Sequence, residues 1–228
     1  MSAAGVAGPF RGFEDEKTEK AGCQEIRVLV GVPSLNYKDR YHSYLPSILP
    51  CIEAALTSVD HEVFVTPPSD KGQWAGLVEC QNMIVEKFLS GDYSHLWIVE
   101  LDVQVPPLAF QKLLDLNVDI ACGYVRRHNG DGLILGFLDE AMRVWYLPLN
   151  AVRGRILSGW VMAGTSCLLI KRQVFENGFR FKFEPQITPD ILFMYQVQRM
   201  GYVAKVHGDV LCGHLPEFQL AEAGLDST

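Results

Sequence analysis

The chain lacks three features that would place it outside the cell or in a membrane. No stretch approaches the run of about 18 apolar residues that a membrane-spanning helix needs. The N-terminal residues contain no hydrophobic segment of a secretory signal, and the six cysteines are scattered singly without a C-x-x-C pair. Isolated cysteines without a leader are typical of reduced thiols. We therefore expect a cytoplasmic protein with no membrane span.

The chain also has comparatively little positive charge. Its 27 acidic side chains outnumber the 20 basic ones, which gives a formal net charge of -7 at pH 7. A surplus of negative charge opposes non-specific binding to the phosphates of nucleic acids. We therefore expect no nucleic-acid partner.

What the sequence does contain is enough apolar material for one compact domain. The 228 residues are 48% apolar and 21% charged, so the chain can bury a sizeable core. Residues 1–24 are rich in Gly, Ala, Glu and Lys without an apolar period, which predicts a flexible N-terminal tail. Residues 215–228 are short and acidic and predict a loose C-terminal tail or a small flap over the site. The domain itself is expected over residues 25–214.

Strand-like and helix-like segments follow one another in a pattern that predicts an α/β fold. Short apolar runs lie between amphipathic segments, as in a mostly parallel sheet covered by helices on both faces. Residues 131–148 differ, because their short apolar runs are joined through a turn and predict a small antiparallel excursion. Strands are expected at residues 26–32, 62–66, 97–102, 118–124 and 161–170, and helices at residues 44–59, 75–90, 108–116 and 172–177.

The most informative stretch extends from Trp97 to Pro107. Its apolar strand ends in Glu100 and Asp102 and then stops at paired prolines, which exposes two acids at a strand tip. In an extended chain these two positions share a face, where hard oxygen ligands can hold Mg²⁺ or Mn²⁺ against a diphosphate. The alternative is a pair of solvated acids at a strand end. Ligands of parallel sheets bind at the carboxyl ends of strands, which is where these acids fall.

The order of several motifs resembles the nucleotide-sugar glycosyltransferases of the GT-A fold, especially the small family-2-like members. The resemblance covers about residues 25–214 and depends on the order of the motifs, because no single motif is specific. The motifs that carry it are Val32-Pro33-Ser34-Leu35-Asn36, Gln81-Asn82, Glu100-Leu101-Asp102-Val103, Ala163-Gly164-Thr165-Ser166-Cys167, Thr188-Pro189-Asp190 and the stretch from Gly201-Tyr202 to His214.

This resemblance implies a single GT-A-like, Rossmann-like domain that binds a nucleotide-diphosphate sugar. Pro33 and Ser34 match the loop that contacts the nucleoside, and Asp70 matches the acid near the base or ribose. Gln81 and Asn82 stand where the family frequently has an Arg-Asn pair, so a cationic phosphate contact is missing there.

The resemblance also implies a metal site for Mn²⁺ or Mg²⁺. Glu100, Leu101 and Asp102 match the D-x-D motif, in which the last aspartate binds the metal and the donor diphosphate. Glu100 stands where the family more often has aspartate. His214 matches a histidine after the last strand that completes the metal site. Taken alone, a histidine after an apolar strand is equally an ordinary hydrogen-bonded structural residue.

Asp190 matches the catalytic base of inverting family members. A carboxylate beside the acceptor can take a hydroxyl proton as that oxygen attacks the anomeric carbon. The structural alternative is complete in itself: Thr188 caps a helix, Pro189 occupies its first position, and Asp190 is a first-turn acid. Pro189 also replaces the glutamate that the family usually has there.

The sequence therefore predicts a metal-dependent glycosyltransferase that moves a sugar from a nucleotide-diphosphate donor to a glycan or other hydroxyl acceptor, with inversion. One alternative is a sugar nucleotidyltransferase, although that class would normally show a Gly-rich basic loop after the first strand. The other is a transferase-like domain that holds a nucleotide or glycan with little or no turnover, since Gln81, Glu100 and Pro189 all depart from the family pattern.

Overall fold

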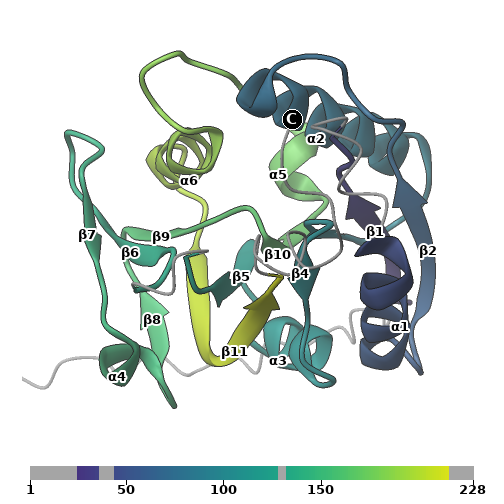
Figure 1. The fold of residues 1–228 in the computed structure, drawn as a ribbon, viewed down its shortest axis with the longest axis horizontal. Helices are drawn as coiled ribbons and strands as arrows, with labels where there is room; N and C mark the ends of the chain where they lie inside the picture. The colour runs from purple at the N-terminus through teal and green to yellow at the C-terminus, as the bar shows by residue number, and fades with distance from the viewer. Residues whose placement is uncertain (1–24, 36–43, 128–131, 216–228) are drawn as a thin grey trace, which may run out of the picture.

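The computed structural model describes residues 25–35, 44–127 and 132–215 (Figure 1). The predicted tail at residues 1–24, most of the predicted C-terminal tail and Asn36 lie outside this part of the chain. The central sheet contains β1 (Arg27–Val32), β2 (Asp60–Val65), β3 (His95–Val99), β4 (Val103–Gln104), β5 (Ile120–Val125), β8 (Ile156–Ser158), β10 (Cys167–Lys171) and β11 (Ala204–His214). The second sheet contains β6 (Leu135–Leu138), β7 (Val144–Tyr146) and β9 (Val161–Ala163). The helices are α1 (Leu45–Ala55), α2 (Gln73–Ser90), α3 (Ala109–Asp115), α4 (Leu149–Val152), α5 (Gln173–Glu176) and α6 (Pro189–Arg199).

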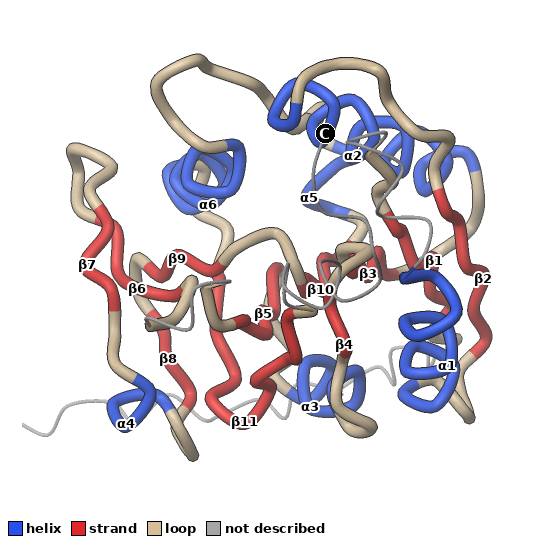
Figure 2. The backbone as a smooth tube through the Cα atoms, viewed as in Figure 1, coloured by secondary structure: helices blue, strands red, loops and turns tan. Residues whose placement is uncertain are grey.

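The central sheet is mixed but mostly parallel. Figure 2 shows the strands in red and the helices in blue. Its strand order is β2-β1-β3-β10-β5-β11-β4, with β8 added against β11. β1 is parallel to β2 and β3, and β5 is parallel to β11. β10 is antiparallel to both of its neighbours, β3 and β5. The predicted α/β class with a mostly parallel central sheet is confirmed.

The predicted antiparallel excursion forms the second sheet. β6 and β7 pair as a hairpin, and β9 joins the other side of β6, also antiparallel. The small-residue segment at positions 164–166 is where the chain leaves this sheet for β10 of the central sheet. One apolar stretch of the sequence thus supplies strands to two sheets, because its small residues permit a tight turn between them.

Helices cover both faces of the central sheet and enclose two cores. Alternate residues of β1 point to opposite faces, as expected for an extended strand. Val28 and Val30 pack with residues of α1 and α3, whereas Leu29 packs with residues of α2, α5 and α6. In Figure 1, α2, α5 and α6 lie above the sheet and α1 and α3 below it.

The loops that follow β1 and β2 lie side by side, as their parallel pairing requires. Thr66 donates its backbone N–H to the carbonyl of Val32 at 3.1 Å, and Ser69 donates to that of Ser34 at 3.3 Å. This edge of the sheet is formed by the carboxyl ends of parallel strands, where ligands of α/β proteins bind.

Among the residues described, no helix combines the length and apolar character needed to cross a membrane.

Candidate functional site

A pocket of about 190 Å³ opens at the carboxyl ends of β1 and β3. The start of α2, the turn between β9 and β10, the start of α6 and the end of β11 complete its wall. Six of the residues predicted for the site line this pocket: Pro33, Glu100, Leu101, Asp102, Asp190 and His214. These residues come from distant parts of the chain, and the topology brings them to one place.

Glu100 and Asp102 both line the pocket, but the backbone that places them there differs from the one predicted. β3 ends at Val99, and residues 100–102 form a turn in which Val103 donates its N–H to the carbonyl of Glu100 at 3.0 Å. The expectation that Glu100 and Asp102 lie on one face of an extended strand is therefore wrong. The turn places both carboxylates in the pocket because it reverses the chain between β3 and β4.

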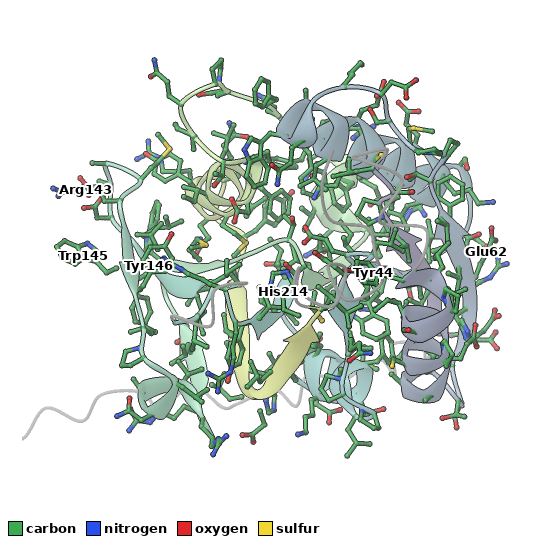
Figure 3. All side chains as sticks on the ribbon, viewed as in Figure 1. Tyr44, Glu62, Arg143, Trp145, Tyr146 and His214 are labelled. Carbon is green, nitrogen blue, oxygen red and sulfur yellow. The ribbon has the colours of Figure 1, made fainter. Side chains whose placement is uncertain are left out.

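His214 lies beside Asp102, with His214 Nε2 at 3.4 Å from Asp102 Oδ2. The antiparallel pairing of β11 with β4 sets His214 opposite Val103, the residue after Asp102. The backbone carbonyl of Arg126 lies 2.7 Å from His214 Nδ1 and can accept a hydrogen bond from it. His214 lies near the centre of the view in Figure 3.

Two opposing effects set the protonation of His214. Burial by itself lowers the pKa of the imidazole, because a charged ring loses solvation. The hydrogen bond to Asp102, the negative charge of that carboxylate, the Arg126 carbonyl and the charge of Glu100 outweigh burial and raise the pKa of His214 above its ordinary value. The shift favours the protonated ring, and a protonated ring is the form that Asp102 attracts.

Glu100 is held by two hydroxyl groups of the β9–β10 turn. Thr165 Oγ1 donates to one carboxylate oxygen at 2.8 Å, and Ser166 Oγ donates to the other at 3.0 Å. Burial and the nearby charge of Asp102 raise the pKa of Glu100 to about 7, although the two hydroxyl donors act in the opposite direction. Near neutral pH this carboxyl group therefore exchanges a proton readily.

Asp190 enters the pocket from the first turn of α6. Asp190 Oδ1 accepts hydrogen bonds from the Thr188 hydroxyl and, at 2.9 Å, from the backbone N–H of Ile191. Thr188 is the N-cap residue and Pro189 the first helical residue, as predicted, but the Thr188 side chain makes no capping bond to the helix backbone. Its hydroxyl is directed to Asp190 instead, and this contact orients the carboxylate.

The pocket also contains residues to which the sequence assigned no individual role. A Cβ added to Gly164 would lie 3.9 Å from Asp190 Oδ2 and 3.1 Å from Ile134, so the glycine keeps space open in front of the carboxylate. Gln73 and Trp74, at the start of α2, also line the pocket, and Trp74 is 40% exposed.

Two residues predicted to contact the nucleoside lie outside the pocket. Ser34 is fully buried, its N–H donates to Thr66 Oγ1 at 2.9 Å, and its hydroxyl has no partner among the described residues. Asp70 is exposed and lines an adjacent hollow formed by the loop after β2, together with Ser69 and Lys71. Asp70 therefore lies along the row of strand ends and not in the pocket itself.

Gln81 and Asn82 also lie outside the pocket. Gln81 is fully buried, and neither its amide nitrogen nor its amide oxygen has a partner among the described residues. The Asn82 amide donates to the carbonyl of Phe181 and accepts from its N–H, both at 3.0 Å. Asn82 thus ties α2 to the segment that precedes α6, which is a structural contact.

Asp102 and His214 are the pocket residues that could hold a divalent metal, with a substrate supplying the remaining ligands. Within the described ranges, no three His, Cys, Asp or Glu side chains are grouped so as to hold a metal ion by themselves. Mg²⁺ is commonly bound through one or two protein carboxylates plus substrate phosphates, so a full protein cage is not required. Asp102 supplies one oxygen donor. His214 supplies Nε2 when its Nδ1 proton is donated to Arg126, because that contact selects the tautomer.

Comparisons with known proteins support the fold. No protein-family model and no curated protein matches the sequence. Among solved structures, the crystal structure of A197 from STIV superimposes with a TM-score of 0.55 at 17% identity, covering 83% of this chain and 85% of that chain. TarS 1-349 from S. aureus gives a TM-score of 0.49 at 9% identity, covering 83% of this chain and 60% of that chain. The chain thus shares the fold of A197, and its architecture is the GT-A-like one predicted from the motifs.

Proposed function

We propose that this protein is a metal-dependent glycosyltransferase that uses a nucleotide-diphosphate sugar as donor and a hydroxyl group, such as that of a glycan, as acceptor. The observation that supports this proposal best is the meeting of Asp102, His214 and Asp190 in one pocket at the strand ends. Asp102 and His214 were predicted to bind the metal and Asp190 to act as the base, and the three residues come from separate parts of the sequence. If each of the three residues had only a local structural role, nothing would require them to lie in the same pocket.

The donor lies across the strand ends in this proposal. The pocket volume of about 190 Å³ is smaller than the roughly 300 to 1,000 Å³ of typical small-molecule sites. A nucleotide sugar therefore extends beyond it, along the loops after β1 and β2. Pro33 borders the pocket on that side, and Asp70 lies in the adjacent hollow, within the row that the nucleoside would follow.

Asp102 and His214 would hold Mn²⁺ or Mg²⁺ against the donor diphosphate. When bound, the ion supplies positive charge that stabilises the diphosphate as it leaves. His214 must give up the proton that it shares with Asp102 in order to act as a ligand, because only a neutral imidazole offers a lone pair. Arg126 keeps the ring oriented through its carbonyl.

Asp190 would act as the base. It takes the proton of the acceptor hydroxyl while the acceptor oxygen forms a bond to the anomeric carbon and the bond from that carbon to the diphosphate breaks. Attack from the side opposite the leaving group inverts the anomeric centre. Thr188 and the N–H of Ile191 hold Asp190 Oδ1, which leaves Oδ2 toward Gly164 for proton transfer.

The test is release of nucleoside diphosphate from a panel of nucleotide sugars, with Mn²⁺ and with chelator. We expect metal-dependent release in the wild type and loss of release in Asp102→Asn and His214→Gln. Asp115→Asn is the matched control, because Asp115 is an exposed acid of α3 bonded to Gln111 and is not part of the pocket. Metal-independent release, or full activity in Asp102→Asn, would contradict the metal assignment.

A transferase-like binding domain without turnover is the second candidate, and one observation favours it. Both carboxylate oxygens of Glu100 are held by Thr165 and Ser166, so this acid is engaged within the protein. If the second candidate is right, nucleoside diphosphates bind with Mn²⁺ but no nucleotide sugar is consumed, with or without added acceptor glycans. The release assay and a binding assay on the same samples therefore distinguish the two.

A further inference from the structure

A second pocket lies on a different part of the molecule, between the end of α5, the loop that follows it and the C-terminal half of α6. Its volume is about 450 Å³, larger than that of the strand-end pocket, and the two share no lining residue. The loop that joins α5 to α6 can be followed in Figure 1. The basic residues of this pocket are Arg180, Lys182 and Arg199.

The charge of this second pocket is opposite to that of the whole chain. Three of its lining side chains are cationic and none is acidic, in a protein whose formal net charge is -7. Among the described residues, none of the three forms an ion pair. The acid of α5 beside the pocket, Glu176, is paired with Arg172 at 2.8 Å. A cluster of cations without acidic partners repels itself, so its natural complement is an anion.

The donors of the second pocket are held in place by the fold. Arg180 is half-buried, and one terminal nitrogen donates to the carbonyls of Phe179 at 2.6 Å and Phe175 at 3.4 Å. Among the described residues, the other guanidinium nitrogens of Arg180 have no hydrogen bond to the protein and are available to a ligand. The Arg199 guanidinium lies over the ring of Tyr195, 6.0 Å from its centre. Because both arginines are oriented before a ligand arrives, little side-chain entropy is lost on binding.

The second pocket is separate from the strand-end pocket, although both use α6. Asp190 and Arg199 are nine residues apart, which corresponds to about two and a half turns and roughly 13 Å along the helix axis. They therefore point to opposite sides of α6. A ligand in the second pocket does not compete with one at Asp190.

We propose that this second pocket is a binding site for a phosphate group, carried either by a soluble phosphate ester or by a lipid headgroup. A phosphate carries more than one negative charge and accepts several hydrogen bonds, which matches two guanidinium groups and one ammonium group. Phe179 and Tyr195 supply an apolar floor against which the attached organic part packs. The proposal does not depend on the transferase function.

The test measures binding of inorganic pyrophosphate by calorimetry, in chelator so that no divalent metal recruits it to the strand-end pocket. We expect saturable binding to the wild type and binding weaker by about tenfold or more in the double variant Lys182→Gln/Arg199→Gln, since charge-assisted hydrogen bonds are lost. Both side chains are exposed, so the variant should fold, and an unchanged melting temperature checks this. Arg153→Gln/Arg155→Gln is the control, because it removes two exposed arginines elsewhere.

A second arm identifies the source of the phosphate. Flotation with vesicles of phosphatidylcholine, with and without phosphatidic acid, reports binding to a lipid headgroup. Selective loss of pyrophosphate binding in Lys182→Gln/Arg199→Gln supports the site and indicates a soluble phosphate as its ligand. Selective loss of phosphatidic acid binding supports the site and indicates a lipid headgroup. The proposal is overturned if the wild type binds neither probe, or if the Arg153→Gln/Arg155→Gln control loses as much binding as the pocket variant.

Discussion

At the scale of single residues, partners within the protein set both the orientation and the protonation of the pocket side chains. Thr165 and Ser166 hold Glu100, Thr188 holds Asp190, and Asp102 pairs with His214. These partners preorganise the acids before a substrate arrives, so less reorganisation is needed when charge develops.

The first prediction tests Asp190 as the base. Asp190→Asn keeps the size of the side chain and an oxygen that can accept from Ile191, but it cannot take a proton. We expect sugar transfer to fall by about 10² to 10⁴-fold, the range of general acid–base catalysis, with nucleotide affinity nearly unchanged. Turnover and nucleotide binding are measured on the same preparation.

Asp115→Asn again serves as the control for Asp190→Asn and should keep full transfer activity. If Asp190 is only a first-turn acid, its replacement costs at most roughly 1 kcal/mol of stability and leaves turnover close to normal. Retained transfer would therefore refute the assignment of the base. The search would then move to Glu184, an exposed acid of the segment before α6, or to a retaining mechanism.

The second prediction concerns His95, at the start of β3. Burial and the charge of Lys171 lower the pKa of His95 to about 4, below the ordinary value of 6.5. Between these two values the unfolded chain binds a proton that the folded chain rejects, so stability falls as the pH is lowered from 6.5 toward 4. We expect His95→Gln to remove about 1 to 2 kcal/mol of this loss between pH 7 and pH 5.

Urea denaturation at pH 7, 6 and 5 measures the effect at His95. The informative quantity is the slope of the unfolding free energy with pH, since His95→Gln also changes packing at every pH. Equal slopes for His95→Gln and the wild type would contradict the prediction.

At the scale of elements, packing between a helix and a strand determines which residues a position tolerates. Gly31 lies in β1 under α2, and an added Cβ would lie 2.3 Å from Cγ2 of Ile84. Real Cβ atoms do not approach another carbon so closely, so either α2 or the Ile84 side chain must shift. The glycine therefore sets how closely α2 lies on the sheet, and with it the position of Trp74 at the pocket.

The third prediction is a double-mutant cycle between these two positions. Gly31→Ala should cost about 1 to 3 kcal/mol through overpacking. Ile84→Ala should cost about 2 to 5 kcal/mol through the cavity that it leaves. Because the alanine at position 31 fills part of that cavity, the double variant should cost less than the sum by about 1 kcal/mol or more.

Chemical denaturation of the four proteins in the cycle provides the measurement. Gly72→Ala is the control, since nothing lies within 4 Å of a Cβ added there, and its cost should stay under about 1 kcal/mol. Additive costs for Gly31→Ala and Ile84→Ala would show that the two side chains do not compete for the same space.

At the scale of the whole molecule, binding at the strand-end pocket should stabilise the entire fold. The pocket is built from β1, β3, α2, α6 and β11, which pack into the two cores on either side of the sheet. A ligand that binds only this assembled arrangement shifts the folding equilibrium by mass action. The melting temperature of the protein therefore reports on ligand binding at the strand-end pocket.

The fourth prediction uses this linkage. At a concentration near one hundred times its dissociation constant, a ligand adds about 2.7 kcal/mol of stability, which for a chain of this size raises the melting temperature by roughly 5 to 10 °C. We expect this rise from a matching nucleoside diphosphate with Mn²⁺ and a much smaller rise with chelator. Asp102→Asn should abolish the difference and Asp115→Asn should preserve it. Equal stabilisation with and without metal in the wild type would argue against a metal at Asp102.

The sequence by itself determined the class of the fold and most of the polar residues of the pocket. Apolar alternation predicts strands, amphipathic runs predict helices, and prolines and glycines mark their ends, all of which are local effects. Asp102, Asp190 and His214 were identified from the order of motifs that carries the family resemblance. Asp102 follows β3, Asp190 lies at the start of α6, and His214 is the last residue of β11. Local sequence patterns predict the ends of strands and the starts of helices, where these residues lie.

Only the tertiary structure decided how these pieces meet. β10 inserts antiparallel between β3 and β5, and this long-range pairing places Thr165 and Ser166 against Glu100. Asn82 carries an amide that could contact a ligand, yet the packing of α2 directs this amide to Phe181. Side-chain partners of this kind depend on segments far apart in the chain, whose approach is governed by packing of the whole core and not by local periodicity.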